Sequence, residues 1–236
     1  MIYVVSDIHG RLDRLKKLVE VINLKISDTL YILGDMIDRG NDSIGVIKYV
    51  MNHNNIISLM GNHERMMLDA LNLNDKYEMN HWNINGNDKT KEDFYKLNKL
   101  EQNKILDYLN SLEYFKIINN KFLLVHAGID ISLLKLDIEF MDFENALYAQ
   151  AHELLWVRDE FLKSEGLKNY NNYTIIFGHT PRPSLNRRLN LTSELPYKIW
   201  YDEVYKNKIC IDTGNCCDNG RMSCLRLDDL KEFYVE

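Results

Sequence analysis

The chain has 236 residues, of which 45% are hydrophobic, 11% aromatic and 27% charged. These are ordinary values for a globular protein, and they exclude a disordered, collagen-like or coiled-coil chain. The formal net charge of -6 disfavours nucleic acid or an anionic membrane surface as a partner. No apolar run is long enough to span a membrane, so the sequence predicts one cytoplasmic domain over residues 1–236.

The first 60 residues alternate short apolar runs with segments of helical spacing. The runs Ile2–Ser6, Thr29–Leu33 and Ile56–Met60 predict strands. The segment between the first two strands carries leucines at helical spacing, and Ser43–Met51 predicts a second helix. Two βαβ units on a parallel sheet are therefore expected.

The middle of the chain is less regular. Asn72–Lys91 is rich in Asn, Asp and Lys with little periodicity, and it is predicted to be a surface insertion. Phe94–Leu112 returns to helical spacing. Two predicted strands, Tyr114–Ile118 and Lys121–Val125, flank Asn119-Asn120, which is a hairpin signal.

The C-terminal part is rich in short strands. One helix is predicted over Glu144–Trp156. The segment from Thr180 to Pro196 contains all three prolines and is predicted to be a long structured loop. Four further runs predict strands that extend the sheets: Thr174–Phe177, Lys208–Ile211, Met222–Leu227 and Glu232–Val235.

Five of the predicted strands end in a polar side chain that can bind a metal. In open α/β sheets ligands bind outside the carboxyl ends of the strands, so these side chains should meet. Carboxylate, amide and imidazole groups without thiolate suit manganese, iron or zinc. Six ligands are too many for one catalytic ion that keeps water, but they suit two ions bridged by Asp35. The six are Asp7, His9, Asp35, Asn62, His126 and His179.

Five motifs carry a resemblance to a known family: Asp7-Ile8-His9-Gly10, Gly34-Asp35-Met36-Ile37-Asp38-Arg39-Gly40, Gly61-Asn62-His63-Glu64, His126-Ala127-Gly128 and Gly178-His179-Thr180. Their order resembles that of the calcineurin-like metallophosphoesterases, and within them the phosphoprotein phosphatase (PPP) family of bacterial and bacteriophage type. Many other metallophosphoesterases have a second histidine where this chain has Pro181, and PPP enzymes lack it. The resemblance implies a four-layer α/β/β/α sandwich of two mixed sheets flanked by helices.

The resemblance also implies a role for each motif residue. A hydroxide between the two ions would attack phosphorus in line. His63 would protonate the leaving alkoxide while Asp38 fixes its tautomer, and Arg39 and Arg158 would bind phosphate oxygens together with Asn62. The first ion would be held by Asp7, His9 and Asp35, and the second by Asp35, Asn62, His126 and His179.

The implied activity is hydrolysis of phosphoserine and phosphothreonine in proteins, with two divalent ions as cofactors. Manganese is the expected metal, with iron or zinc as alternatives. The alternative substrate is a dinucleoside polyphosphate such as diadenosine tetraphosphate, because its hydrolases share these motifs. A scaffold without catalysis would have lost ligands or the His63–Asp38 pair, and all of these are present.

Two groups of residues lie outside the motifs. Arg182, Arg187 and Arg188 follow the last metal motif, and we hypothesise that they contact further phosphates of the substrate. The adjacent Cys216 and Cys217 lack the spacing of zinc sites or redox pairs, so reduced structural thiols are expected. The sequence indicates neither an oligomeric state nor a physiological substrate.

Overall fold

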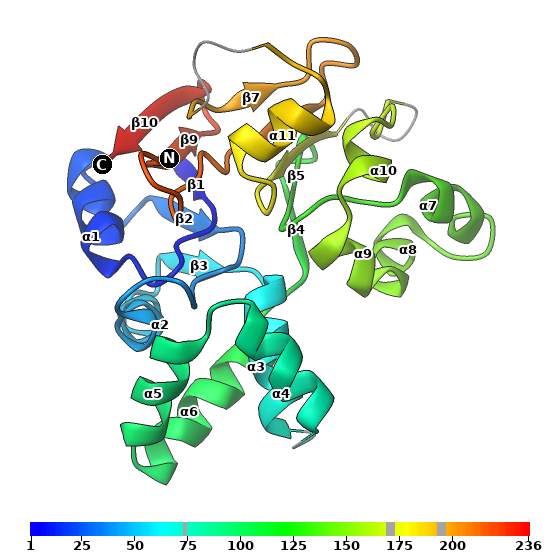
Figure 1. The fold of residues 1–236 in the computed structure, drawn as a ribbon. Helices are drawn as coiled ribbons and strands as arrows, with labels where there is room; N and C mark the ends of the chain where they lie inside the picture. Colours follow the sequence, from blue (N-terminus) through cyan, green and yellow to red (C-terminus); the bar gives the residue numbers. More distant parts are fainter. Residues whose placement is uncertain (73–74, 169–172, 193–196) are drawn as a thin grey trace.

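The computed structural model describes residues 1–72, 75–168, 173–192 and 197–236. Its strands are β1 (Ile2–Val5), β2 (Thr29–Ile32), β3 (Ile56–Ser58), β4 (Phe115–Ile118), β5 (Phe122–Val125), β6 (Thr174–Phe177), β7 (Trp200–Tyr201), β8 (Lys208–Cys210), β9 (Met222–Arg226) and β10 (Lys231–Val235). They form two sheets, with the orders β10-β9-β1-β2-β3 and β4-β5-β6-β8-β7 (Figure 1). In each sheet three neighbouring strands are parallel, and the remaining strands are antiparallel at the edges. The predicted mixed sheets are therefore confirmed.

Side chains alternate between the two faces of each strand, and this alternation builds three apolar layers. In β1, Tyr3 and Val5 pack on the helix side, whereas Val4 packs between the sheets. In β5, Leu123 packs on the helix side of the second sheet and Leu124 faces the first sheet. All five side chains are buried. The two sheets thus share one apolar layer, as the predicted four-layer sandwich requires.

Helices cover the outer faces of the sheets (Figure 1). Helices α1 and α2 lie beside the first sheet, α7 to α10 lie beside the second, and α4 to α6 form a lobe next to α3. Among the described residues no helix is long and apolar enough to cross a bilayer. The helices are α1 (Leu12–Val21), α2 (Ser43–Met51), α3 (Asn62–Asn72), α4 (Lys76–Ile84), α5 (Asp88–Lys96), α6 (Lys99–Asn110), α7 (Ile131–Asp137), α8 (Phe143–Ala149), α9 (Ala151–Trp156), α10 (Asp159–Leu162) and α11 (Arg182–Arg188).

The irregular character predicted for Asn72–Lys91 is wrong. Most of its described part belongs to α4 and the start of α5, and Trp82 within it is fully buried. The polar residues that suggested a loop begin helices instead, because the side chain of Asp75 accepts a hydrogen bond from the N–H of Tyr77. Residues 73–74 lie outside the described residues.

Two C-terminal predictions also need correction. The predicted loop from Thr180 to Pro196 contains helix α11, with Pro183 in its first turn, where proline is tolerated. Residues 193–196 of that segment lie outside the described residues. The predicted helix Glu144–Trp156 is divided at Gln150 into α8 and α9. The short elements α7, α10 and β7 were not predicted.

The hairpin between β4 and β5 forms as predicted. The strands are antiparallel, and the N–H of Lys121 donates to the carbonyl of Ile118 at 3.0 Å. Asn119 and Asn120 both adopt the left-handed conformation, with φ values of 52° and 49°. Two such residues in sequence are typical of the turns that match the twist of a hairpin.

We expect the residue at position 120 to set the stability of this turn. Asn120→Ala should lower the free energy of unfolding by about 1 kcal/mol, because a Cβ without a compensating polar group is unfavourable in the left-handed region. Asn120→Gly should change it by less than about 0.5 kcal/mol, because glycine adopts this conformation freely. Urea unfolding of both variants measures the difference, and equal stabilities would contradict the assignment of the turn.

Candidate metal centre

The predicted metal ligands lie at the carboxyl ends of parallel strands from both sheets. Each follows its strand directly or within four residues, and each is at most 5% exposed. Asp7 and His9 follow β1, Asp35 follows β2, Asn62 follows β3, His126 follows β5 and His179 follows β6. Residues from both sheets therefore lie together at the carboxyl ends of their parallel strands, a region called the rim below.

Three ligand atoms converge on one side of this rim. Nε2 of His126 lies 2.9 Å from Oδ1 of Asn62 and 3.1 Å from Nδ1 of His179. Nδ1 of His179 lies 3.0 Å from the same amide oxygen. Nδ1 of His126 lies 2.6 Å from the carbonyl oxygen of Leu33, so it carries the proton and leaves a lone pair on Nε2. Such a convergence of lone pairs fits a cation.

The side chains of Asn62, His126 and His179 are called the second metal group below, after the second predicted ion. Asp35 joins them to the first metal group, which contains His9. Its Oδ1 lies 3.5 Å from Nε2 of His126, whereas its Oδ2 lies 3.7 Å from Nε2 of His9 and 3.9 Å from Nε2 of His63. Nδ1 of His9 is 3.0 Å from the carbonyl oxygen of Ile37, so its Nε2 also faces the site with a lone pair. One carboxylate thus presents a different oxygen to each group, so it could contribute to the binding of an ion at each.

Two further carboxylates, those of Asp7 and Asp212, are near the two metal groups. Asp7 accepts hydrogen bonds from the N–H of His179 at 3.2 and 3.0 Å through its two oxygens, and it lies outside the closest sets of ligand atoms. Asp212 follows β8, and burial and the charge of Asp7 raise its pKa well above the usual range. The sequence analysis gave Asp212 no role, although it has the same position after a strand as the predicted ligands.

Burial sets the protonation of the centre. Removal from water lowers the pKa of all four imidazoles and so favours the neutral form, which for the three predicted ligands is the form that binds metals. Burial and then the charge of Asp7 raise the pKa of Asp35. Divalent cations would offset this crowding of carboxylates, so the donor set fits the implied metal. The imidazoles belong to His9, His63, His126 and His179.

The backbone of the rim adopts unusual conformations that aim the ligands. Asp7, His9, Asp35 and His179 have φ values of 51°, 47°, 54° and 63°. Non-glycine residues rarely adopt this region, and they persist there only when their surroundings hold them. A Cβ at Gly61 would lie 2.3 Å from the nitrogen of Asp35 and 2.4 Å from its Oδ1, so glycine is required for the close approach.

Glu64 holds the loop that carries Asp35, a role that the sequence analysis missed. Its Oε2 accepts from the N–H groups of Asp35 at 2.8 Å and Gly61 at 3.0 Å, and its Oε1 accepts from Met36 at 2.7 Å. Burial raises the pKa of Glu64 to about 8. The only signal in the sequence is its place as the last residue of the motif Gly61-Asn62-His63-Glu64.

His63 and Asp38 form a buried pair beside the metal groups. Nδ1 of His63 lies 2.7 Å from Oδ2 of Asp38, and both side chains are fully buried. Burial raises the pKa of Asp38 to about 7. Arg39 donates through Nη2 to Nε2 of His63 and through Nη1 to Nε2 of His9, both at 2.9 Å. The guanidinium therefore lies where the pair and the first metal group meet.

Arg158 approaches the second metal group. It is partly buried, and burial lowers its pKa. Its charge is also among the causes that lower the pKa of His126 and His179. Arg39 and Arg158 thus give the rim two cationic side chains.

Two of the other predicted arginines have polar partners on α10 and α11. Nε of Arg182 donates to Oδ1 of Asn186 at 2.7 Å, and Arg188 forms an ion pair with Asp159. Arg187 is exposed. A contact between any of them and substrate phosphate stays a prediction.

The four cysteines are free thiols, as expected. Cys216 lies near the centre and accepts a hydrogen bond from Nη1 of Arg39 at 3.6 Å. Burial raises the pKa of Cys216 to about 12. The neutral thiol is a poor nucleophile, so its surroundings do not favour a redox role.

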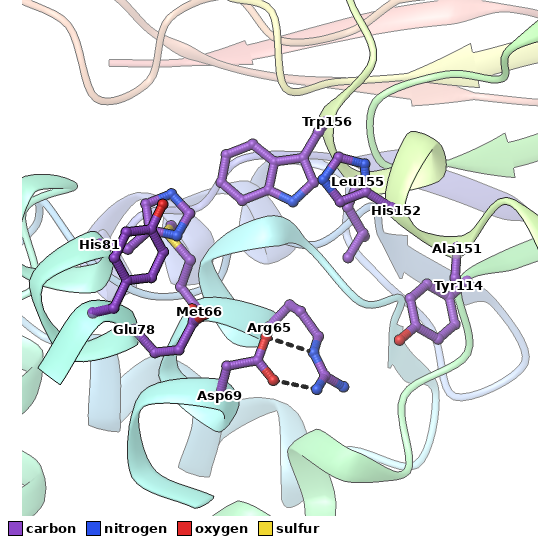
Figure 2. A pocket seen from close by; sticks show the side chains of 11 residues that line it. Arg65, Met66, Asp69, Glu78, His81, Tyr114, Ala151, His152, Leu155 and Trp156 are labelled. Carbon is purple, nitrogen blue, oxygen red and sulfur yellow. Dashed lines mark hydrogen bonds and ion pairs between the residues drawn. The ribbon is translucent and has the colours of Figure 1, made fainter. Parts of the chain in front are cut away.

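A cavity of about 650 Å³ is lined by side chains that include His81, His152 and Trp156 (Figure 2). The rings of His81 and His152 lie nearly parallel to that of Trp156, at centroid distances of 5.5 and 6.3 Å. Trp156 contacts His179 edge to face at 6.1 Å. The cavity therefore adjoins the metal ligands on its ring-lined side.

The rim of carboxylates, imidazoles and arginines defines a metal-dependent hydrolase of phosphate esters. The family model described as calcineurin-like phosphoesterase matches residues 1–219, so the chain belongs to this family.

Relatives of two kinds are similar to the chain. Serine/threonine-protein phosphatase 2 of Escherichia coli (strain K12) is 30% identical over 239 residues, which cover 96% of this chain and 92% of that protein. A symmetrical bis(5'-nucleosyl)-tetraphosphatase of Wigglesworthia glossinidia brevipalpis is 32% identical over 210 residues, covering 86% of this chain and 71% of that protein.

Solved structures support the fold. A protein serine/threonine phosphatase from Saccharomyces cerevisiae gives a TM-score of 0.63 at 20% identity, over 99% of this chain and 78% of that one. A cold-active protein-tyrosine phosphatase of a Shewanella species gives 0.59 at 17% identity, over 100% and 80%.

We expect Asp35→Asn to weaken the binding of both ions, because the two metal groups share this carboxylate. After dialysis, elemental analysis should find less than about half of the wild-type metal, whereas His179→Asn should lose about one of two ions. Asp69→Asn is the control, since Asp69 pairs with Arg65 outside the centre. Full metal content in Asp35→Asn would refute the bridging role.

Proposed function

We propose that this phosphoesterase is a serine/threonine protein phosphatase that uses two divalent ions, with manganese as the expected metal. The observation that carries this proposal is the position of Asp35, whose two oxygens face separate histidine groups beside Arg39 and the His63–Asp38 pair. The Escherichia coli phosphatase supports the protein substrate, because its similarity extends over nearly the full length of both chains.

Different residues of the rim would bind the metal ions and the phosphate oxygens of the substrate. When bound, two divalent ions lower the pKa of a water nucleophile and neutralise charge on the phosphoryl oxygens. Arg39 and Arg158 would hold phosphate oxygens, together with the amide of Asn62, because a guanidinium can form two parallel hydrogen bonds. Asp7, His9 and Asp35 would hold the first ion, and Asp35, Asn62, His126 and His179 the second.

His63 is suited to protonate the leaving group. Its Nδ1 faces Asp38, which orients the ring and stabilises the imidazolium, so Nε2, once protonated, is the atom that would deliver the proton to the leaving group. The hydrogen bond from Arg39 to Nε2 places the phosphate-binding guanidinium at the same point. The phosphate bound by Arg39 would therefore place the leaving-group oxygen close to His63.

The second candidate is a dinucleoside polyphosphate hydrolase. Relatives with that name match most of the chain. The cavity beside Trp156 also favours it, because the rings of His81 and His152 are surfaces on which a nucleobase stacks. We favour the protein substrate because the Escherichia coli phosphatase combines 30% identity with coverage of 92% of its length, whereas the tetraphosphatase relatives have either less coverage, 71% at 32% identity, or less identity, 23% at 95% coverage.

A direct comparison of substrates tests the proposal. Manganese-loaded protein should release phosphate from a phosphoserine peptide at least about tenfold faster, by kcat/KM, than it cleaves diadenosine tetraphosphate. Phosphate release and nucleotide chromatography at equal enzyme concentration measure the two rates. A preference for the dinucleotide would replace the first candidate by the second.

His63→Asn tests the assignment of the proton donor. We expect kcat for phenyl phosphate to fall by about 100-fold, because phenolate leaves slowly without a proton. p-Nitrophenyl phosphate should lose much less, since its leaving group is stable as an anion. Metal content should stay at the wild-type level. Equal losses on the two esters would count against the role.

A further inference from the structure

Helices α4 and α5 hold the turn that carries two residues of the proposed chemistry. Their segment, residues 76–96, is called the α4–α5 clamp below. The indole N–H of Trp82 donates to Oδ2 of Asp38 at 2.8 Å, and Oγ1 of Thr90 accepts from the N–H of Asp38 at 3.1 Å. The carbonyl of Gly86 accepts from the N–H of Arg39 at 2.9 Å. Three parts of the clamp thus contact two consecutive residues.

The turn needs this support because its backbone is unfavourable by itself. Asp38 and Arg39 have φ values of 70° and 65°, a region that non-glycine residues rarely adopt and that is rarer still for two in sequence. The N–H of Asp38 is also 2.9 Å from Oγ of Ser43, which Thr90 contacts at 2.8 Å. The clamp therefore stabilises the conformation from which both side chains reach the centre.

Trp82 acts on the carboxylate itself. Its indole N–H and Nδ1 of His63 contact the same oxygen of Asp38, at 2.8 and 2.7 Å, while Oδ1 has no partner among the described residues. All three side chains are fully buried. Because this carboxylate is fully buried, the rigid indole helps to fix which oxygen His63 meets.

We propose that Trp82 is a positioning residue for protonation of the leaving group, acting on His63 through Asp38. The inference rests on the proposed function, because it assumes that His63 supplies that proton. The indole orients Asp38, and Asp38 orients the imidazole so that Nε2 faces the departing oxygen. The indole N–H of Trp82 is directed to Asp38 and not to any of the six predicted metal ligands.

This role predicts a loss that depends on the leaving group. Without the indole N–H, Asp38 holds His63 less firmly and proton delivery slows. Esters whose leaving group needs a proton are affected, and esters whose leaving group departs as a stable anion are not. A merely structural role would lower both rates together, or would lower stability and metal content.

The experiment compares Trp82→Phe with wild type on two esters. The variant keeps an aromatic ring and removes the N–H. We expect kcat for phenyl phosphate to fall by about tenfold, the size expected for one hydrogen bond to a charged group. kcat for p-nitrophenyl phosphate should change by less than about twofold, with KM and metal content unchanged. Incorporation of benzothienylalanine at Trp82 is a second variant that removes only the N–H, if Trp82→Phe folds poorly.

Phe94→Leu is the matched control. Phe94 is buried in α5 in the same apolar cluster as Trp82, but it has no polar contact with Asp38. Its substitution should lower stability without changing the ratio of the two rates. Adding Trp82→Phe to His63→Asn should cause no further loss on phenyl phosphate, because the two residues act in one step.

The results of these measurements distinguish the failure of the role of Trp82 from the failure of the proposed function. Equal losses on both esters, no loss, or a further tenfold loss in the double variant would overturn the role of Trp82 while wild-type turnover upholds the proposed function. If manganese-loaded wild type hydrolyses neither ester nor the phosphopeptide, the proposed function fails and the role of Trp82 fails with it.

Discussion

The carboxylate of Asp35 depends on an arrangement that no single sheet can supply. Its Oδ2 faces His9 from the same sheet, and its Oδ1 faces His126 from the other sheet. Both contacts require that the parallel strands of the two sheets end at a common rim. The alternation of side chains along β1 and β5 creates the apolar layer that joins the sheets in this position. The geometry of the centre therefore depends on the alternation of side chains, every second residue, that packs the two sheets together.

Around this centre, buried polar groups hold the candidate ligands and the His63–Asp38 pair. Glu64 collects three backbone N–H groups around Asp35, and the α4–α5 clamp holds Asp38 and Arg39. These contacts offset the cost of left-handed backbone at positions that are not glycine. Glu64 and the α4–α5 clamp are therefore as important to the site as its ligands, because a small misplacement of a reacting group lowers the catalytic rate strongly.

The strands and the convergence of the candidate metal ligands were predictable because their signals are local. Each candidate ligand follows a short apolar run directly or within four residues, and neighbouring parallel strands bring such positions together. The α4–α5 clamp was not predictable in this way, because Asn and Asp favour both loops and helix starts. The contact between Trp82 and Asp38 joins residues 44 positions apart, and nothing in the intervening sequence indicates it. Asp212 has the same local signal, a position just after a short apolar strand, although it is not among the six predicted ligands.

The origin of the ligands also affects how long the folded chain survives. His126 and His179 come from the second sheet, whereas Asp35 and Asn62 come from the first, so an ion between them would act as a cross-link between the two halves. Without that cross-link the halves are joined by apolar contacts between the sheets and by hydrogen bonds such as those from His179 to Asp7. By mass action, the free metal concentration would then influence resistance to proteolysis in addition to activity. The abundance of the protein would follow the metal supply of its surroundings.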